Sequence, residues 1–338
     1  MFDRTDQLCA IESILHSALR AEPSGAPSSK YARRYQAPSQ PYVSKLHTSL
    51  EAYGWDGAWY RRAYFDDGAP LGSARGSECQ IDSIAQSWSV LSGIADAGRA
   101  RQAMASLHER LVRPDAQLVQ LLDPPFDQRG PNPGYIAGYV PGVRENGGQY
   151  THGAIWATMA FAALGERERA WQLLEMINPV RHAASAEGVA RYKVEPYVMA
   201  ADVYSVAPHT GRGGWSWYTG SAGWMYRLVV ESLLGLRIAT TEAGARLVVA
   251  PCLPPDWTHC TLQYRYRATL YEIEMLQQDG DGASELRLDG LAQAADSLLL
   301  VDDGRLHRVQ LTLRKRSAPA SAADGRASSL AGFDDAAK

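Results

Sequence analysis

Paired cysteines are the first thing this sequence lacks. Its four cysteines are Cys9, Cys79, Cys252 and Cys260, and none belongs to a Cys-x-x-Cys pair or has a histidine at metal-ligand spacing. This absence argues against a zinc site and against a disulfide framework. We therefore expect no metal or organic cofactor, and a reducing, cytoplasmic setting.

Long apolar runs and an excess of positive charge are missing too. No stretch approaches the ~20 apolar residues of a membrane helix, and the first twenty residues lack a basic segment followed by an apolar run. The 34 basic and 37 acidic residues give a formal net charge of −3, with the basic residues scattered. Nothing here attracts nucleic acid or an anionic membrane, so neutral polar partners are expected.

Phenylalanine is scarce, whereas the other aromatic residues are abundant. Five Phe stand against nine Trp and seventeen Tyr in 338 residues. Indole and phenol rings combine a flat apolar face with a polar edge, which suits stacking on sugar rings as well as core packing. The 46% hydrophobic content is sufficient for a large core and two packed units.

Helical hairpins dominate the middle of the chain. Residues 1–43 read as a helix and a Pro/Ser-rich linker, so the main domain is expected at 44–238. One hairpin has Ile81, Ile84, Trp88 and Leu91 on one face, then a stripe from Ala100 to Leu111. A second pairs an apolar inner helix, 150–164, with a one-sided outer helix, 170–177. Because 99–104 parallels 169–174, we expect a toroid of hairpins with a third inner helix at 219–234.

The sequence pattern changes from helical to strand-like after Ile238. Short strands separated by turn residues are expected at 246–250, 261–267, 270–276, 285–288, 298–301 and 309–313. These predict a small antiparallel β domain over 239–316. The Ala, Ser, Gly and Asp content of 317–338 predicts a disordered tail.

The first of three unusual connecting segments spans Pro131 to His152. Its glycines and prolines shape a loop, and Arg144, Glu145 and Asn146 offer donors and acceptors. It ends with Thr151 and His152 in the first turn of the inner helix, where free backbone amides and an imidazole suit an anion. The alternative is a capping threonine and a core histidine.

The second and third segments also allow two interpretations. Glu195 and Asp202 either hold sugar hydroxyls or are structural carboxylates that cap helices and pair with Lys193 or Arg191. In the third segment, 209–227, Thr219, Gly220 and Ser221 open a helix, so hydroxyls and amides converge as a phosphate requires. Trp215, Trp217 and Trp224 surround that point. The alternative is a glycine-rich helix start with aromatic core packing.

Five motifs, in order over about residues 50 to 275, carry a family resemblance. They are YFDDGAPLGS (64–73), IDSIAQSW (81–88), PGVRENGGQYTH (141–152), RYKVEPYV (191–198) and GRGGWSWYTGSAGW (211–224). The sequence resembles glycoside hydrolase family 94, which holds inverting cellobiose and chitobiose phosphorylases. It is most similar to the C-terminal phosphorylase-like region of cyclic β-1,2-glucan synthases.

The resemblance implies a mainly α fold, a partial (α/α)6 barrel of hairpins followed by the small β domain. It implies inverting phosphorolysis or glycosyl transfer on β-linked glucans, with inorganic phosphate as co-substrate and an Asp as general acid. By the same match, His152, Thr219 and Gly220 hold phosphate. Arg144, Glu145, Glu195 and Trp217 lie in or near the sugar subsites.

The sequence departs from the family at the general acid. The Gly-Asp-Trp-Asn-Asp-Gly motif and an earlier phosphate-binding Arg are absent. Trp55-Asp56-Gly57 matches a later family segment, so Asp56 is not assigned as the acid and no catalytic residue is named. Only about seven of the twelve barrel helices can be found. Residues 1–43 resemble no segment of the family. The expectation is therefore an N-terminally truncated fragment whose activity is impaired when it is alone.

Three functions stay open at this point. The first is phosphorylase-type chemistry on a β-glucan, probed by phosphate-dependent glucose 1-phosphate release. The second is a non-catalytic glycan-binding or assembly module, whose protein partner is a second copy or the missing N-terminal portion. The third is an (α/α)6 hydrolase that uses two carboxylates and water, for which Glu145 and Asp202 are the candidates.

Overall fold

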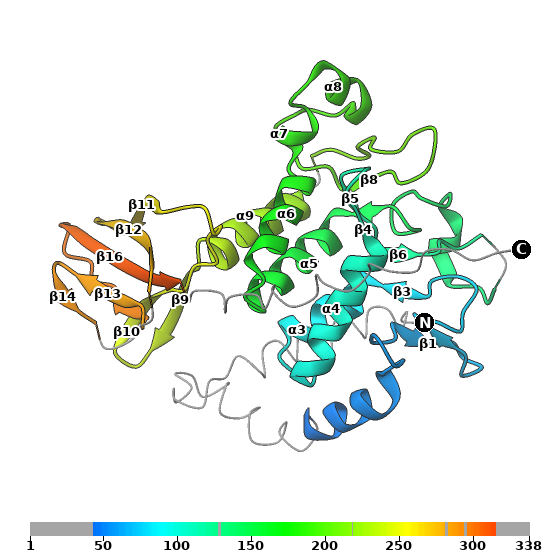
Figure 1. Cartoon of the computed structure of the whole chain (residues 1–338), viewed down its shortest axis with the longest axis horizontal. Coiled ribbons are helices and arrows are strands. Elements are labelled where there is room, and N and C mark those ends of the chain that lie inside the picture. Colours follow the sequence, from blue (N-terminus) through cyan, green and yellow to red (C-terminus); the bar gives the residue numbers. More distant parts are fainter. Residues whose placement is uncertain (1–42, 128–129, 218, 281–282, 294–295, 316–338) are drawn as a thin grey trace, which may run out of the picture. The chain divides into compact units, whose positions relative to one another are not determined.

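A computed structural model describes residues 43–127, 130–217, 219–280, 283–293 and 296–315. The expectations for residues 1–42 and for the tail 317–338 lie outside this part. The described chain forms two compact units (Figure 1). The first runs to Asp256 and includes Ser297–Leu300, and the second holds Trp257–Asp296 and the residues from Val301.

The helices of the first unit form the expected hairpins. Helix α3 (Ser83–Leu91) precedes α4 (Ala97–Leu111), and α5 (Thr151–Ala163) precedes α6 (Arg167–Ile177). Helix α9 (Thr219–Arg227) continues as the π-helix η3 (Leu228–Leu233), which matches the third inner helix. A helix at 43–49 leads into the π-helix η1 (Leu50–Gly54), and the short α7 (Pro179–His182) and α8 (Ala186–Tyr192) follow α6.

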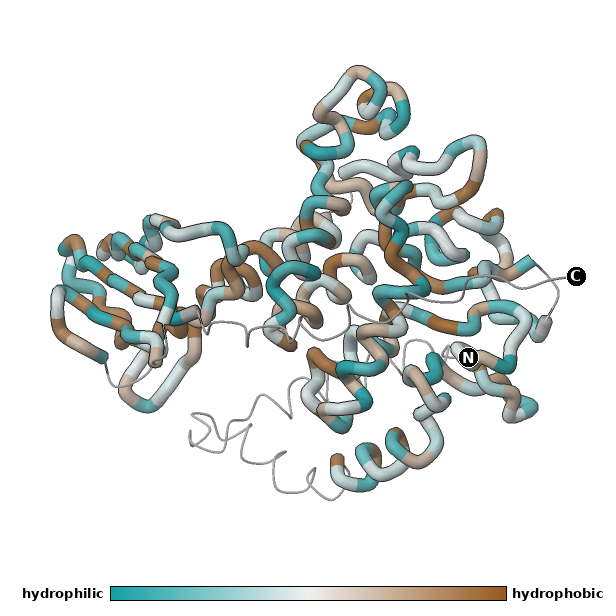
Figure 2. The backbone as a smooth tube through the Cα atoms, viewed as in Figure 1, coloured by the Kyte–Doolittle hydropathy of each residue, from teal (hydrophilic) through white to brown (hydrophobic). Residues whose placement is uncertain are grey.

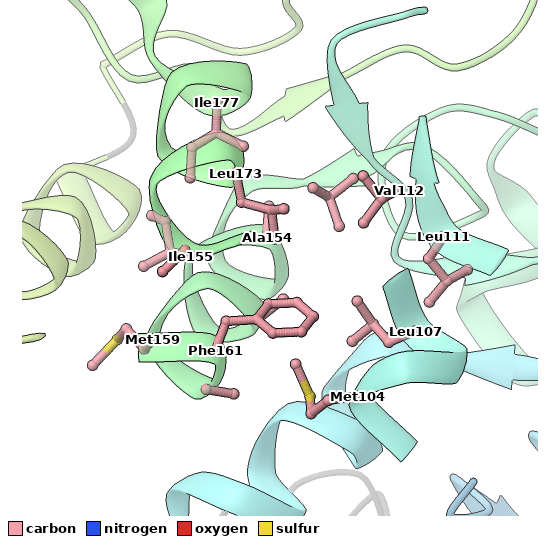
Figure 3. Close-up of a cluster of buried hydrophobic side chains, with 14 of the residues drawn as sticks. Met104, Leu107, Leu111, Val112, Ala154, Ile155, Met159, Phe161, Leu173 and Ile177 are labelled. Atoms are coloured by element: carbon pink, nitrogen blue, oxygen red, sulfur yellow. The ribbon is translucent and has the colours of Figure 1, made fainter. Parts of the chain in front are cut away.

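Helix α5 lies between the other hairpin elements and is buried along most of its length, as its apolar sequence predicts. The outer helices bury one stripe each. Met104, Leu107 and Leu111 of α4 and Leu173 of α6 are buried, which confirms both predicted stripes. Figure 3 shows these side chains around Phe161 of α5. Removal of this apolar surface from water stabilises the hairpins against each other.

Helix α3 differs from the prediction. Its predicted apolar face, which includes Ile84 and Trp88, is only half-buried, whereas Ser83, Gln86 and Ser87 are buried. Small side chains let α3 approach α5 closely: a Cβ on Gly153 of α5 would lie 3.3 Å from the Ser83 hydroxyl oxygen. The Ser87 hydroxyl and the Gln86 amide find partners nearby, since Ser87 donates to the Ser83 carbonyl at 2.7 Å and Gln86 donates to the Tyr60 carbonyl at 2.8 Å. Apolar periodicity alone identified the wrong face.

Short strand pairs bind the long connections together. They are β1 (Ala63–Tyr64) with β2 (Pro70–Leu71), β3 (Ile81–Asp82) with β6 (Leu122–Asp123), β4 (Val112–Arg113) with β5 (Leu118–Val119), and β7 (Gln149–Tyr150) with β8 (Asp202–Val203). A 3₁₀ turn, η2, covers Gly134–Gly138. The β7–β8 pair joins the first and second predicted site segments.

A three-stranded antiparallel sheet closes the first unit. Its order is β15 (Ser297–Leu299), β10 (Gly244–Val249), β9 (Leu236–Thr241). Strand β9 follows η3 almost directly, and β15 returns from far along the chain to pair with β10. The boundary between the units therefore lies after Asp256 and not at the expected 238/239.

The second unit is a five-stranded sheet, ordered β11 (His259–Tyr266), β12 (Thr269–Asp279), β16 (Leu306–Lys315), β13 (Glu285–Leu288), β14 (Leu291–Ala292). Its strands alternate in hydropathy (Figure 2). The expectation of a purely antiparallel domain is wrong, because β12 and β16 are parallel, with Ile273 opposite Val309. A parallel neighbour requires a long crossover, and the chain makes it through β13, β14 and β15.

No helix in the described ranges is both long enough and apolar enough to span a membrane.

Candidate functional site

The structure brings the starts of α5 and α9 together. A Cβ built on Gly220 would lie 2.7 Å from Nε2 of His152. The imidazole therefore lies directly against the first-turn backbone of α9, and only a glycine leaves room for it. Helix N-termini carry unsatisfied amides and a partial positive charge, so the junction is suited to an anion. Thr219 is the first residue of α9, and its side chain lies outside the described atoms.

His152 is packed between aromatic rings. Its ring stacks on Tyr150 at 5.0 Å between centroids and meets Trp156 edge-on at 6.1 Å. Nδ1 is buried and has no hydrogen-bond partner in the part of the chain that the structure describes. Burial lowers the pKa of the imidazole, which favours the neutral form with one N–H donor. The unpartnered Nδ1 argues against a satisfied core histidine, whereas the lowered pKa follows from burial alone.

The backbone at the start of α5 differs from the expectation. The Thr151 amide is not free, because it donates to the Ala201 carbonyl at 2.9 Å. Thr151 is also not the cap: Tyr150 occupies that position and caps with no side-chain hydrogen bond. Any anion contact at this helix start therefore involves the His152 side chain and the amides after Thr151.

Arg144 and Glu145 form a compact charged pair beside Trp215. Nε of Arg144 lies 3.6 Å from a Glu145 carboxylate oxygen, and both side chains are mostly buried. The guanidinium also covers the Trp215 ring, with its carbon 4.0 Å from the ring centroid. Arg144 adopts a left-handed backbone conformation, φ 51°, in a turn. Sequence reasoning predicted the pair but not its contact with Trp215.

Glu195 and Trp217 lie on the surface and contact each other. The indole N–H of Trp217 donates to a Glu195 carboxylate oxygen at 3.0 Å. The Glu195 pKa is lowered by its own backbone amide and then by Trp217. Trp217 is 67% exposed and Tyr197 is 73% exposed, so both side chains have ring surface available for stacking. The alternative pairing of Glu195 with Arg191 is not among the ion pairs of the described residues, where Arg191 pairs with Glu187 at 2.6 Å.

Trp224 packs in the aromatic core, which is the alternative to ligand binding that the sequence left open. It packs edge-on against Trp156, with centroids 5.6 Å apart, as part of the helical core. Arg227 covers its ring at 4.7 Å. Of the three tryptophans expected around the helix start, only Trp215 and Trp217 offer surface to a ligand.

Asp202 is buried, and its carboxylate interacts with other groups of the protein. One carboxylate oxygen accepts from the Arg144 amide at 3.2 Å, and the side chain is 1% exposed. Burial raises its pKa, although the charge of Arg144 and the amides of Arg144 and Trp215 act in the opposite direction. A carboxylate enclosed in this way cannot activate water, which argues against the two-carboxylate hydrolase with Glu145.

Two other carboxylates near this part of the chain are also structural. Asp56 accepts from the Arg61 guanidinium at 2.7 Å, the Ser73 hydroxyl at 2.8 Å and the Ala74 amide at 2.7 Å. Burial acts to raise its pKa, but these hydrogen bonds outweigh it and the pKa is lowered. A general acid must carry a proton, so Asp56 is unsuited to that role. Asp82 caps α3 from a buried position.

A cleft of about 440 Å³ lies elsewhere, between Phe65–Glu78 and the segment around Phe126. None of the predicted site residues lines it. Among the described residues, no group of three or more His, Cys, Asp and Glu side chains is placed to bind a metal ion.

Known proteins resemble this chain over most of its length. It is 48% identical over 241 residues to the cyclic beta-(1,2)-glucan synthase NdvB of Rhizobium meliloti (strain 1021), covering 71% of this chain. Two proteins of Paenibacillus borealis, solabiose phosphorylase and 3-O-beta-D-glucopyranosyl-beta-D-glucuronide phosphorylase, are 31% and 32% identical over 80% of this chain. The chain spans 8% of the synthase and 34% of each phosphorylase.

The family match begins earlier than the motifs indicated. Residues 28–235 match the model of the glycosyl hydrolase 94 superfamily catalytic domain. The match therefore includes residues 28–43, which were expected to resemble nothing in the family. It also includes every predicted site residue, from Arg144 to Gly220. The chain belongs to the glycosyl hydrolase 94 superfamily.

Proposed function

We propose that this chain forms the phosphate-binding and sugar-binding part of a glycoside phosphorylase-type site on a β-linked glucan, with β-1,2-glucan as the first substrate to test. The observation that carries the proposal is the contact of His152 with Gly220, where two helix starts meet. Family membership supports the chemistry, and the similarity to a cyclic beta-(1,2)-glucan synthase supports the glucan. In this proposal, α3 to α6 and α9 are hairpin elements of an (α/α)6 barrel.

The roles follow from the geometry. Phosphate accepts from the His152 imidazole and from amides in the first turn of α9 at Thr219 and Gly220. The Arg144 and Glu145 pair, with the exposed Trp217 and Glu195, binds sugar through hydroxyl contacts and ring stacking. Phosphate then attacks the anomeric carbon with inversion, and it is a co-substrate, with no other cofactor.

The leaving oxygen needs a proton that this chain does not readily supply. The family acid motif is absent from the sequence, and Asp56, Asp82 and Asp202 are bound within the protein. General acid catalysis contributes ~10²–10⁴-fold. We therefore propose that the chain by itself binds its ligands but turns over slowly.

The test is the release of glucose 1-phosphate from β-1,2-glucan oligosaccharides by the purified chain, with and without phosphate. Slow or absent release, together with binding of both ligands by calorimetry, is the expected result. Rapid phosphate-dependent release would contradict the missing acid. Release of sugar at equal rates without phosphate would support the hydrolase and overturn the phosphorylase chemistry.

A glycan-binding module is the second candidate, and the exposed Tyr197 and Trp217 rings favour it. Exposed aromatic rings offer flat apolar faces on which sugar rings can stack. Calorimetry separates the two candidates, because a pure glycan-binding module binds glucan but not inorganic phosphate.

A further inference from the structure

Three separate segments of the candidate site meet at one buried carboxylate, Asp202. Its own segment pairs with the first through β7 and β8, where Tyr150 lies opposite Asp202. On the other side, the Gly214 amide donates to the Asp202 carbonyl at 2.8 Å, and the Ala201 amide donates to the Trp215 carbonyl at 2.6 Å. Asp202 is therefore the middle of three adjacent stretches of backbone.

The side chain of Asp202 adds a second connection between the same segments. Its carboxylate accepts from the Arg144 amide at 3.2 Å, and the Trp215 amide lies beside it. These two residues are the ones whose side chains stack, with the guanidinium 4.0 Å above the indole. One carboxylate thus fixes the backbone on both sides of that stack.

The packing around the carboxylate leaves no freedom for it to move. A Cβ on Gly214 would lie 2.1 Å from Oδ1 and 2.6 Å from the carboxyl carbon of Asp202. The third segment can approach only because residue 214 has no side chain. The glycine and the carboxylate therefore form a matched pair, in which each requires the other.

We propose that Asp202 is a positioning residue, which holds Arg144 and Trp215 in register so that the Arg144, Glu145 and Trp215 side chains form one sugar subsite. It touches neither sugar nor phosphate and acts through its neighbours. This role rests on the proposed function for the sugar part of the site. It predicts that sugar binding depends on Asp202 more than phosphate binding does, because Asp202 bonds to Arg144 directly but reaches His152 only through the paired and stacked Tyr150.

The first experiment compares Asp202→Asn with Asp56→Asn. Asp56 is a carboxylate in another loop that accepts three hydrogen bonds, so it controls for the general cost of a lost charged hydrogen bond. We expect Asp202→Asn to weaken binding of a β-1,2-glucan oligosaccharide by roughly 10- to 100-fold, the range for a hydrogen bond to a charged group. Inorganic phosphate should bind it as it binds the wild-type chain, and Asp56→Asn should bind both ligands normally.

The second measurement is hydrogen exchange, which needs no ligand. In Asp202→Asn, the amides of 142–146 and 212–216 should exchange faster while those of α4 and α6 stay protected. Unchanged exchange in both loops would overturn the positioning role. Faster exchange with unchanged glucan affinity would also overturn it. If the wild-type chain binds no glucan, the proposed function fails, and the exchange rates still decide whether Asp202 holds the two loops.

A double-mutant cycle guards against a variant that simply misfolds. Gly214→Ala places its methyl group on the carboxylate and should loosen the same two loops. In an Asp202→Ala background that clash is gone, so adding Gly214→Ala should change exchange and glucan binding little. Equal effects of Gly214→Ala in both backgrounds would contradict the matched pair.

Discussion

Gly220→Ala gives a sharp test of the phosphate site. The added methyl group would lie 2.7 Å from Nε2 of His152, closer than real side chains come to a neighbour. Ordinary contact begins near 3.5 Å, so the imidazole must retreat by roughly 0.7 Å or more. That shift breaks a short hydrogen bond from the imidazole to an anion. A hydrogen bond to a charged group contributes about 1.5–3 kcal/mol, so phosphate should bind roughly 10- to 100-fold more weakly.

The stability of the fold should change little, because two effects oppose each other. Alanine is favoured over glycine within a helix by up to about 1 kcal/mol, whereas displacement of the imidazole by the added methyl group costs stability. Gly223→Ala is the matched control, because it lies in the same helix and its Cβ would meet nothing within 4 Å. Calorimetric titration with phosphate and thermal unfolding measure the two effects. Phosphate affinity of Gly220→Ala equal to that of Gly223→Ala would refute the site.

Three further predictions concern stability and sugar binding. Hydrogen bonding to Asp289 raises the pKa of His307, so its contribution to the second unit is complete below the unfolded value of about 6.5 and is lost as pH rises through the raised pKa. His307→Asn should therefore flatten the pH dependence of thermal unfolding above that value, and an unchanged profile would exclude the linkage. Gly153→Ala should destabilise the first unit by about 1–3 kcal/mol in urea unfolding, because its Cβ would lie 2.8 Å from a Leu121 methyl group; a neutral result would show that the Leu121 side chain can move aside at no cost. Trp217→Ala should weaken glucan binding in calorimetry by roughly tenfold while phosphate affinity stays constant, and equal loss of both would place Trp217 outside the sugar subsite.

The sequence was most informative where burial follows apolar periodicity. The outer helices α4 and α6 bury the residues that their stripes predicted, because Leu107 and Leu173 have no favourable alternative to the core. The same rule failed for α3, where small serines are buried and bond to their own helix. Apolar periodicity detects only apolar residues. It does not detect a buried polar residue whose hydrogen bond is formed within its own helix.

The candidate site also contains one contact that the sequence predicted and one that it did not. Contact between His152 and Gly220 could be anticipated, because motifs in the sequence marked both helix starts. The role of Asp202 could not, since its partners, Arg144 and Gly214, come from segments far from it in the sequence. The parallel pairing of β12 with β16 could not be predicted for the same reason, because the two strands lie far apart in the sequence. Local sequence patterns predict which residues form strands. The order and direction of those strands in the sheet depend on the path of the whole chain.

That returning path limits how the protein can be divided. Strand β15 belongs to the first unit, although the residues on both sides of it in the sequence belong to the second. A chain ended at Asp256 would keep every residue of the family match but would lose β15. The β10 backbone from Arg246 to Val248 would then become an open edge, which recruits other chains and promotes aggregation. Expression of the first unit in a soluble form should therefore require residues up to at least Leu300.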